Sequence, residues 1–119
     1  ILIDDMISSG KSILEIASLL KKRGAGKIFI CTTFGLFTEG MEKFDEAHKK
    51  GYFDKLLTTN LVYQEPELLE KPYYISCDMS KYIALIIDTL NHDMSVSHLL
   101  NPADRIKRCV SNYMAQYEK

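Results

Sequence analysis

Short apolar runs alternate with segments of helical periodicity along most of this chain of 119 residues. The apolar runs predict four β-strands, at residues 1–3, 27–33, 54–59 and 73–76. The segments between and after them predict helices at residues 12–23, 38–50, 79–90 and about 102–117. Residues 60–72 contain two prolines and are expected to form a loop. Strands that alternate with helices predict an α/β fold, with an open, mostly parallel sheet and helices on both faces.

The loops at the carboxyl ends of these strands are the expected ligand site. In open α/β sheets, ligands bind at that edge of the sheet. Three predicted loops, at residues 4–11, 32–38 and 58–63, fall on it. We therefore expect the chemistry of the chain to come from these loops.

The composition argues against several classes of function. A formal net charge of −1 gives no basic surface for nucleic acid, and no apolar run approaches the roughly 20 residues that cross a bilayer. We therefore expect neither a nucleic-acid partner nor a membrane partner. The three cysteines, Cys31, Cys77 and Cys109, are widely spaced and belong to no CxxC pair. This favours reduced thiols and a cytoplasmic protein over a disulfide framework or a zinc site.

The first predicted strand leads directly into a segment that suits a sugar phosphate. Asp4 and Asp5 supply adjacent carboxylates, which accept hydrogen bonds from vicinal hydroxyls such as those of a ribose. The small residues after them open the predicted helix at 12–23, and backbone N–H groups at a helix N-terminus bind phosphate. The candidate binding residues are Asp4, Asp5, Ser8, Ser9, Gly10, Lys11 and Ser12.

Three other interpretations of this segment are possible. Gly10-Lys11-Ser12 matches the end of a nucleotide-binding P-loop, but Asp5 stands where that motif requires its first glycine. An acidic pair also closes the first strand of response-regulator receivers. A receiver needs a phosphoacceptor aspartate after a later strand, whereas the later predicted strands here end in threonine or serine. The simplest alternative is an acidic turn that only caps the following helix.

The chain begins with apolar residues, then two acids, two more apolar residues, and small hydroxyl and glycine positions. This order resembles the PRPP motif of type I phosphoribosyltransferases. Three later segments favour one family. They resemble, in the same order, segments of ribose-phosphate pyrophosphokinases (PRPP synthetases). The segments are Thr-Phe-Gly-Leu-Phe-Thr at 33–38, Leu-Thr-Thr-Asn at 57–60 and the stretch at 92–100. The helix at about 102–117 extends beyond the usual end of that family. Three residues depart from its pattern, because Ser8 replaces an acid, Lys11 a glycine and Phe34 a histidine.

This resemblance implies that the full-length protein transfers diphosphate from Mg-ATP to the anomeric hydroxyl of ribose 5-phosphate, which gives PRPP. Asp4 and Asp5 would bind the ribose hydroxyls and Mg²⁺, and residues 8–12 would hold the 5′-phosphate. In that family, the ATP-binding region and a basic catalytic loop precede the PRPP motif. Residues 1–119 are therefore expected to form a C-terminal domain, with the PRPP motif at 1–12, that is inactive alone and belongs to a homo-oligomeric protein.

Two other functions remain open. One is a catalytically silent subunit that resembles PRPP synthetase and regulates an active partner, which the residues Ser8, Lys11 and Phe34 would allow. The other is a nucleobase-salvage phosphoribosyltransferase, which shares the opening motif but has no need of the segment at 33–38.

Overall fold

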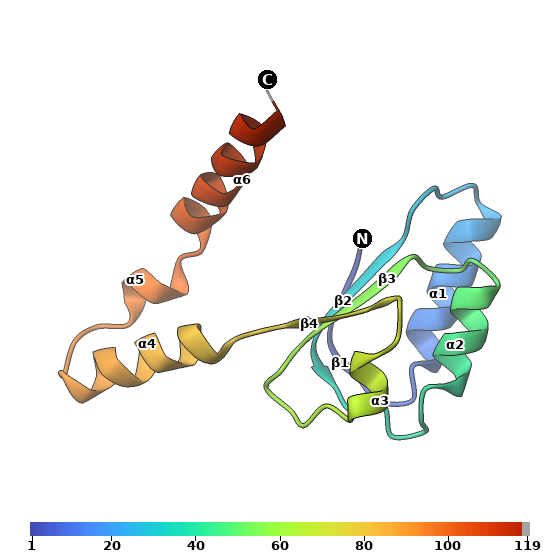
Figure 1. Cartoon of the computed structure of the whole chain (residues 1–119), viewed down its shortest axis with the longest axis horizontal. Coiled ribbons are helices and arrows are strands. Elements are labelled where there is room, and N and C mark those ends of the chain that lie inside the picture. The colour runs from blue at the N-terminus through green and yellow to red at the C-terminus, as the bar shows by residue number, and fades with distance from the viewer. Residues whose placement is uncertain (118–119) are drawn as a thin grey trace. The chain divides into compact units, whose positions relative to one another are not determined.

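The computed structural model describes residues 1–117, which belong to two compact units (Figure 1). The sheet unit comprises residues 1–79, and the helical unit begins at residue 80. In chain order, the elements are β1 (Leu2–Ile7), α1 (Lys11–Lys22), β2 (Phe29–Gly35), α2 (Glu42–Lys49), β3 (Lys55–Thr59), α3 (Pro66–Leu69), β4 (Tyr74–Cys77), α4 (Ser80–Asn91), α5 (Ser97–Leu100) and α6 (Ala103–Tyr117).

The sheet unit is built on four parallel strands in the order β1-β2-β3-β4. Ile30 of β2 pairs with Leu2 of β1 and with Leu56 of β3, and Leu56 pairs in turn with Tyr74 of β4. Parallel neighbours require a crossover connection, which α1 supplies between β1 and β2 and α2 supplies between β2 and β3. The predicted α/β class with an open parallel sheet is confirmed, but within the sheet unit the helices cover one face rather than both.

Helices α1 and α2 lie side by side on one face of the sheet (Figure 1). Right-handed crossovers between strands that are added in one direction all return over the same face. α1 buries Ile13 and Ala17, which lie one turn apart, as its periodicity predicts. The buried hydrophobic core consists of Ile7, Ile13, Ala17, Ile28, Ile30, Phe44, Ala47, Phe53, Leu56, Leu68, Tyr73 and Tyr74.

One apolar residue of each strand also lies in register across the sheet. Ile3 pairs with Cys31, Cys31 with Leu57, and Leu57 with Ile75. These residues alternate with the buried ones, so they belong to the opposite face. Ile3 is 82% exposed and Ile75 is 40% exposed. Within the described sheet unit, this face is therefore open to solvent.

Strand β1 is longer than predicted, because its ladder continues past the two acids. Pairing with β2 extends to Ile7, opposite Gly35, and the N–H of Leu36 donates to the carbonyl oxygen of Ile7 at 2.9 Å. Asp4 and Asp5 therefore lie within a strand, and the following loop is reduced to residues 8–10. The prediction that the first strand ends at residue 3 was wrong.

Two short helices were not predicted, and one helix is shorter than predicted. α3 lies in the expected loop at 60–72, with Pro66 at the first helical position, where a missing N–H leaves no hydrogen bond unmade. α5 follows α4 after a short turn. α2 begins at Glu42 rather than at 38, because the preceding loop contains positive φ angles at Phe37 (46°) and Gly40 (76°).

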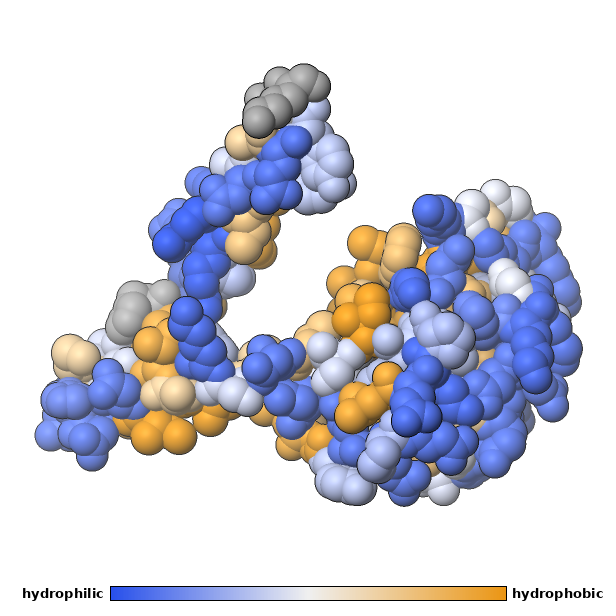
Figure 2. All heavy atoms as spheres, in the orientation of Figure 1, coloured by the Kyte–Doolittle hydropathy of each residue, from blue (hydrophilic) through white to orange (hydrophobic). Residues whose placement is uncertain are grey.

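The helical unit has little buried surface of its own. Among its described residues, Thr89 is the only buried one. Arg105 of α6 lies over the ring of Tyr82 of α4, 4.8 Å from its centroid, and the Tyr82 hydroxyl donates to the carbonyl oxygen of Leu99 at 2.9 Å. Figure 2 shows apolar side chains on the outside of these helices. No helix in the described part of the chain is long and apolar enough to span a membrane.

Candidate phosphate-binding site

The loop between β1 and α1 is built around Gly10. Its φ angle of 74° lies in the left-handed region, and its carbonyl oxygen accepts the N–H of Leu14 at 3.0 Å, at the start of α1. A Cβ atom at this position would lie 2.2 Å from Cζ of the buried Phe44. The backbone conformation and the packing therefore both require glycine at the N-terminus of α1.

A surface hollow of about 190 Å³ lies at this N-terminus. Its lining residues are Asp4, Met6, Ile7, Ser8, Ser9, Gly10, Lys11, Ser12 and Ile13. Six of the seven predicted binding residues thus line one hollow, and Asp5 is the exception. The first N–H groups of a helix have no partners within the helix, and they lie at the positive end of its dipole. The hollow therefore has the donors and the polarity that suit an anion.

The two adjacent carboxylates take different positions on β1. Successive side chains of a strand point to opposite faces, so Asp4 lines the hollow whereas Asp5 does not. Both residues are exposed. One carboxylate oxygen of Asp4, Oδ1, accepts the N–H of Asp5 at 2.9 Å, which leaves the other oxygen of Asp4 available to a ligand.

The loop after β2 is hydrogen-bonded to the loop after β1. The hydroxyls of Ser8 and Thr38 lie 3.0 Å apart and share a hydrogen bond, and the N–H of Thr38 donates to the carbonyl oxygen of Ser8 at 3.1 Å. The contact between Thr38 and Ser8 was not predicted from the sequence. A contact between residues so far apart in the chain leaves no local pattern in the sequence.

Aromatic side chains connect the loops beneath the hollow. Phe44, which closes against Gly10, packs edge to face with Phe37, with their ring centroids 5.3 Å apart. Phe37 in turn packs against Tyr74, with centroids 6.3 Å apart. A positive φ is uncommon for a bulky residue, so the packing of Phe37 holds its backbone in place. Periodicity identified neither Phe44 nor Phe37 as a support for the site.

Gln64 fixes the loop after β3. Its Nε2 donates to the Tyr74 hydroxyl at 2.7 Å and to the carbonyl oxygen of Thr59 at 3.1 Å, while its Oε1 accepts the Ser76 hydroxyl at 2.6 Å. Burial raises the pKa of Tyr74, so its hydroxyl remains protonated and available for these bonds. The position of this loop was predicted, but its hydrogen bonds were not.

A second hollow, of about 550 Å³, lies between the loops after β2 and β3. Its charged lining residues are Glu42, Asp45, Glu65, Glu67 and Lys71. Asp45 accepts hydrogen bonds from Lys71 Nζ at 2.9 Å and from the Tyr73 hydroxyl at 2.7 Å. Burial acts to raise the pKa of Asp45, but these two bonds outweigh it and lower the pKa. The excess of carboxylates makes this hollow unfavourable for a phosphate.

The described residues contain no group of three or more His, Cys, Asp or Glu side chains that could hold a metal ion. Mg²⁺ is usually bound by one or two carboxylates together with substrate phosphates and water. Asp4, which lines the hollow, therefore fits an ion that is shared with a bound phosphate, whereas Asp5 points to the other face of β1 and the pair does not form a metal site alone.

The fold and this loop define an α/β protein whose first strand–helix connection has the geometry of a phosphate-binding loop. The family model described as "Phosphoribosyl synthetase-associated domain" matches residues 1–101. The chain belongs to this family.

Its relatives include both enzymes and associated proteins. The chain is 29% identical over 101 residues to the ribose-phosphate pyrophosphokinase of Mycoplasmopsis pulmonis, covering 83% of this chain and 30% of that protein. It is 31% identical over 99 residues to phosphoribosyl pyrophosphate synthase-associated protein 2 of Homo sapiens, covering 83% and 26%. The chain spans less than a third of the length of these relatives.

A solved structure has a similar fold. The phosphoribosylpyrophosphate synthetase of Mycobacterium smegmatis matches with a TM-score of 0.66 and 21% identity, covering 77% of this chain and 30% of that chain. The predicted relationship to PRPP synthetases is confirmed at the level of the family, which also includes the associated proteins. The expected position at the C-terminal end of a longer protein stays a prediction.

Proposed function

We propose that this chain supplies the ribose 5-phosphate-binding part of a ribose-phosphate diphosphokinase. The observation that carries the proposal is the hollow at Gly10, which joins the start of α1, three serines, a lysine and the Asp4 carboxylate. Relatives named ribose-phosphate pyrophosphokinase support the same function.

The start of α1 would hold the 5′-phosphate. Backbone N–H groups of the first turn and the hydroxyls of Ser8, Ser9 and Ser12 would donate to its oxygens. Lys11, the first residue of α1, would add a full positive charge next to the phosphate. The loop is held by Gly10 and its contact with Phe44, so it needs little rearrangement to bind.

A carboxylate of β1 would hold the sugar. Asp4, from inside the hollow, would accept hydrogen bonds from the ribose hydroxyls, and Asp5, which points to the other face of β1, would add at most a weaker electrostatic contribution. Asp4 would also hold Mg²⁺ together with phosphate oxygens, and the ion would neutralise part of the phosphate charge.

In the full-length protein, the anomeric hydroxyl of the bound ribose 5-phosphate would lose its proton and take the diphosphate of ATP, which gives PRPP and releases AMP. The residues of this chain contribute by holding and orienting the sugar, because phosphoryl-type transfer depends mainly on positioning and charge neutralisation. The ATP-binding part would lie outside residues 1–119, in a longer, cytoplasmic, homo-oligomeric protein that has this chain as its C-terminal domain. We therefore expect residues 1–119 alone to form no PRPP.

Isothermal titration calorimetry of the 119-residue chain tests the proposal. We expect ribose 5-phosphate to bind, and ribose to bind at least about tenfold more weakly, since it lacks the charge-assisted phosphate contacts. Lys11→Glu should weaken ribose 5-phosphate by at least about tenfold, whereas Lys27→Glu, the same charge change at an exposed residue outside the hollow, should not. Equal binding by both variants, or no binding by the wild type, would contradict the proposal.

A second candidate is a non-catalytic subunit that regulates an active PRPP synthetase. The relatives named phosphoribosyl pyrophosphate synthase-associated protein favour it, as does Lys11 in a loop position where the synthetases have glycine. Calorimetry and a turnover assay on the full-length protein separate the candidates. Binding of ribose 5-phosphate and ATP without PRPP formation favours the regulatory subunit. Nucleotide formation from PRPP and a nucleobase would instead favour a salvage phosphoribosyltransferase.

A further inference from the structure

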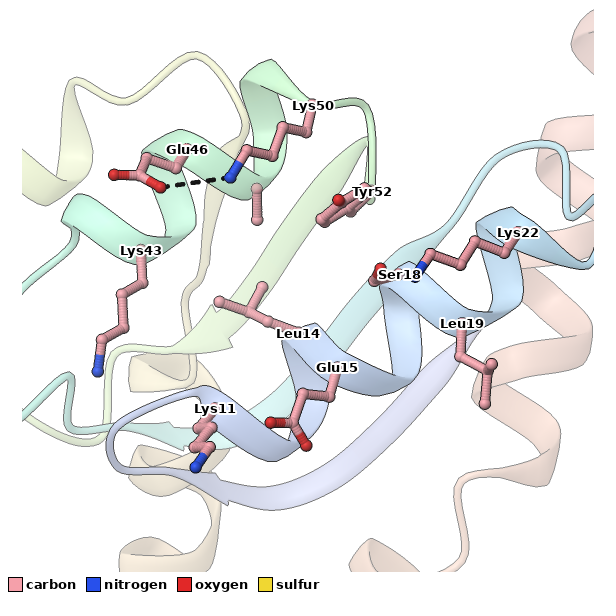
Figure 3. A pocket seen from close by; sticks show the side chains of 11 residues that line it. Lys11, Leu14, Glu15, Ser18, Leu19, Lys22, Lys43, Glu46, Lys50 and Tyr52 are labelled. Carbon is pink, nitrogen blue, oxygen red and sulfur yellow. Dashed lines mark hydrogen bonds and ion pairs between the residues drawn. The ribbon is translucent and has the colours of Figure 1, made fainter.

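A groove of about 550 Å³ lies between α1 and α2 on the surface of the sheet unit (Figure 3). Its apolar residues are Leu14 and Leu19 of α1, Ala47 of α2, and Tyr52. Leu19 is 49% exposed although it belongs to the amphipathic α1. The groove therefore presents an apolar floor that the sheet unit leaves partly uncovered.

The rim of the groove carries a positive charge. Its charged side chains are Lys11, Lys22, Lys43, Lys50, Glu15 and Glu46. Lys50 pairs with Glu46 at 3.4 Å, and Lys43 pairs with Glu39 outside the groove. Among residues 1–117, the rim residues Lys11, Lys22 and Glu15 have no ion-pair partner, so two unpaired amino groups face one unpaired carboxylate. These two unpaired amino groups belong to the first and last residues of α1.

We propose that this groove docks an acidic amphipathic helix of a partner protein. A helix laid in a groove buries its apolar stripe against the floor and keeps its polar side chains at the rim. Lys11 and Lys22 are eleven residues apart on α1, which corresponds to about 16 Å, or about three turns of a helix. Acidic side chains about three turns apart on the partner helix would match both lysines.

The charge of the groove argues for a different protein rather than a second copy of this chain. The exposed helices of a second copy are α4 and α6. α6 has an apolar face, but within Ala103–Tyr117 it carries Arg105, Lys107 and Arg108 against a single acid, Asp104. α4 carries one lysine and one aspartate. Neither helix complements a rim of lysines.

A fluorescently labelled peptide can serve as the probe. It would be a synthetic 15-residue helix with leucines at i, i+3, i+4 and i+7 and glutamates beside them, titrated with the 119-residue chain by fluorescence anisotropy. We expect saturable binding that Leu19→Asp and Lys22→Glu each weaken by at least about tenfold. The matched controls are Ile16→Asp, on the same helix at 48% exposure but outside the groove, and Lys27→Glu. Both controls should bind within about twofold of the wild type.

Several outcomes would overturn the docking proposal. One is a loss of affinity in the two control variants as large as that in Leu19→Asp and Lys22→Glu. Another is a peptide with lysines in place of the glutamates that binds as tightly as the acidic peptide. A third is that the acidic peptide does not bind at all. Self-association that Leu19→Asp abolishes would also overturn it, because the groove would then be an interface between copies. Leu19 and Lys22 lie outside the phosphate hollow, so calorimetry with ribose 5-phosphate on the same variants reports on the two proposals separately.

Discussion

The sheet unit and the helical unit contain similar amphipathic helices, but only the first unit buries them. In the sheet unit, Ile13 of α1 and Phe44 of α2 are buried in the core. In the helical unit, α6 has the same periodicity, yet Val110 is 54% exposed and Tyr113 is 60% exposed. An amphipathic pattern therefore predicts a helix and its apolar face, but it does not identify the surface that covers that face.

The difference lies in what each unit offers its helices. The four strands give α1 and α2 a wide apolar surface, whereas the helices of the helical unit are joined by few contacts, such as that of Arg105 with Tyr82. Short helices gain most of their stability from packing and are marginal without it. We therefore expect the stability of the chain to reside mainly in residues 1–79.

Replacing a large, fully buried side chain of the sheet unit should have the largest effect. Phe44 is fully buried, so Phe44→Ala should lower the free energy of unfolding by about 3–5 kcal/mol. Val110→Ala in α6 is the matched change in the helical unit and should stay within about 0.5 kcal/mol. Urea unfolding followed by circular dichroism measures both. Similar losses in the two variants would refute the contrast between the units.

Two glycines separate the effect of packing from that of backbone conformation. Gly10→Ala should lower the free energy of unfolding by about 2–4 kcal/mol, because two unfavourable effects add up. The new side chain must adopt a left-handed φ, and its Cβ lies against the Phe44 ring. Gly24→Ala has a similar φ of 89° with no atom within 4 Å, and should cost only about 1 kcal/mol. The difference in urea midpoint between the variants measures the contact with Phe44. Equal midpoints would mean that this contact does not hold the loop.

The parts of the fold that depend on neighbouring residues could be predicted from the sequence. The apolar periodicity of α1 and the short runs of the strands placed these elements, because burial alternates locally in helices and strands. The continuation of β1 to Ile7 was missed, since it depends on pairing with β2 at Gly35. α3 was missed because a single turn has too few residues to show a period.

The same distinction applies to the candidate site. Six residues of the hollow were predicted because the acid, the small residues and the start of α1 are adjacent in sequence. Its supports, Thr38 and Phe44, come from other elements, and no local pattern reveals them. Asp4 and Asp5 point to opposite faces because successive side chains of a strand alternate. This difference was not predicted, because the first strand was expected to end at residue 3, before both acids.

The two carboxylates of β1 should therefore differ in their effect on binding. Asp4→Asn should weaken ribose 5-phosphate by about tenfold, because it removes a charged acceptor from the hollow. Asp5→Asn should weaken it by about threefold or less, since Asp5 does not line the hollow. Calorimetry on both variants, with unchanged circular dichroism as the control, measures the difference. A larger loss for Asp5→Asn would place the sugar on the opposite side of β1.

The smallest effect concerns acid stability, and it again contrasts the units. Burial opposes ionisation of Asp45, but hydrogen bonds from Lys71 and Tyr73 hold its pKa below the ordinary value of about 3.9. A depressed folded-state pKa gives stabilisation that is present above the ordinary pKa and is lost as the pH falls through the folded-state pKa. Asp45→Asn should lower the free energy of unfolding by about 1 kcal/mol at neutral pH. On acidification, the free energy of unfolding of this variant should fall less than that of the wild type.

Asp88→Asn is the matched change in α4, where the aspartate side chain is 66% exposed. Its urea midpoint should follow that of the wild type at every pH between about 7 and 3, because the exposed pair of Asp88 with His92 contributes little to the free energy of unfolding. If Asp45→Asn also followed the wild type, the Asp45–Lys71–Tyr73 contacts would contribute nothing to the sheet unit. The acid lability of that unit would then have to come from other carboxylates. If Asp88→Asn departed from the wild type instead, the helical unit would hold more cooperative structure than its exposed helices indicate.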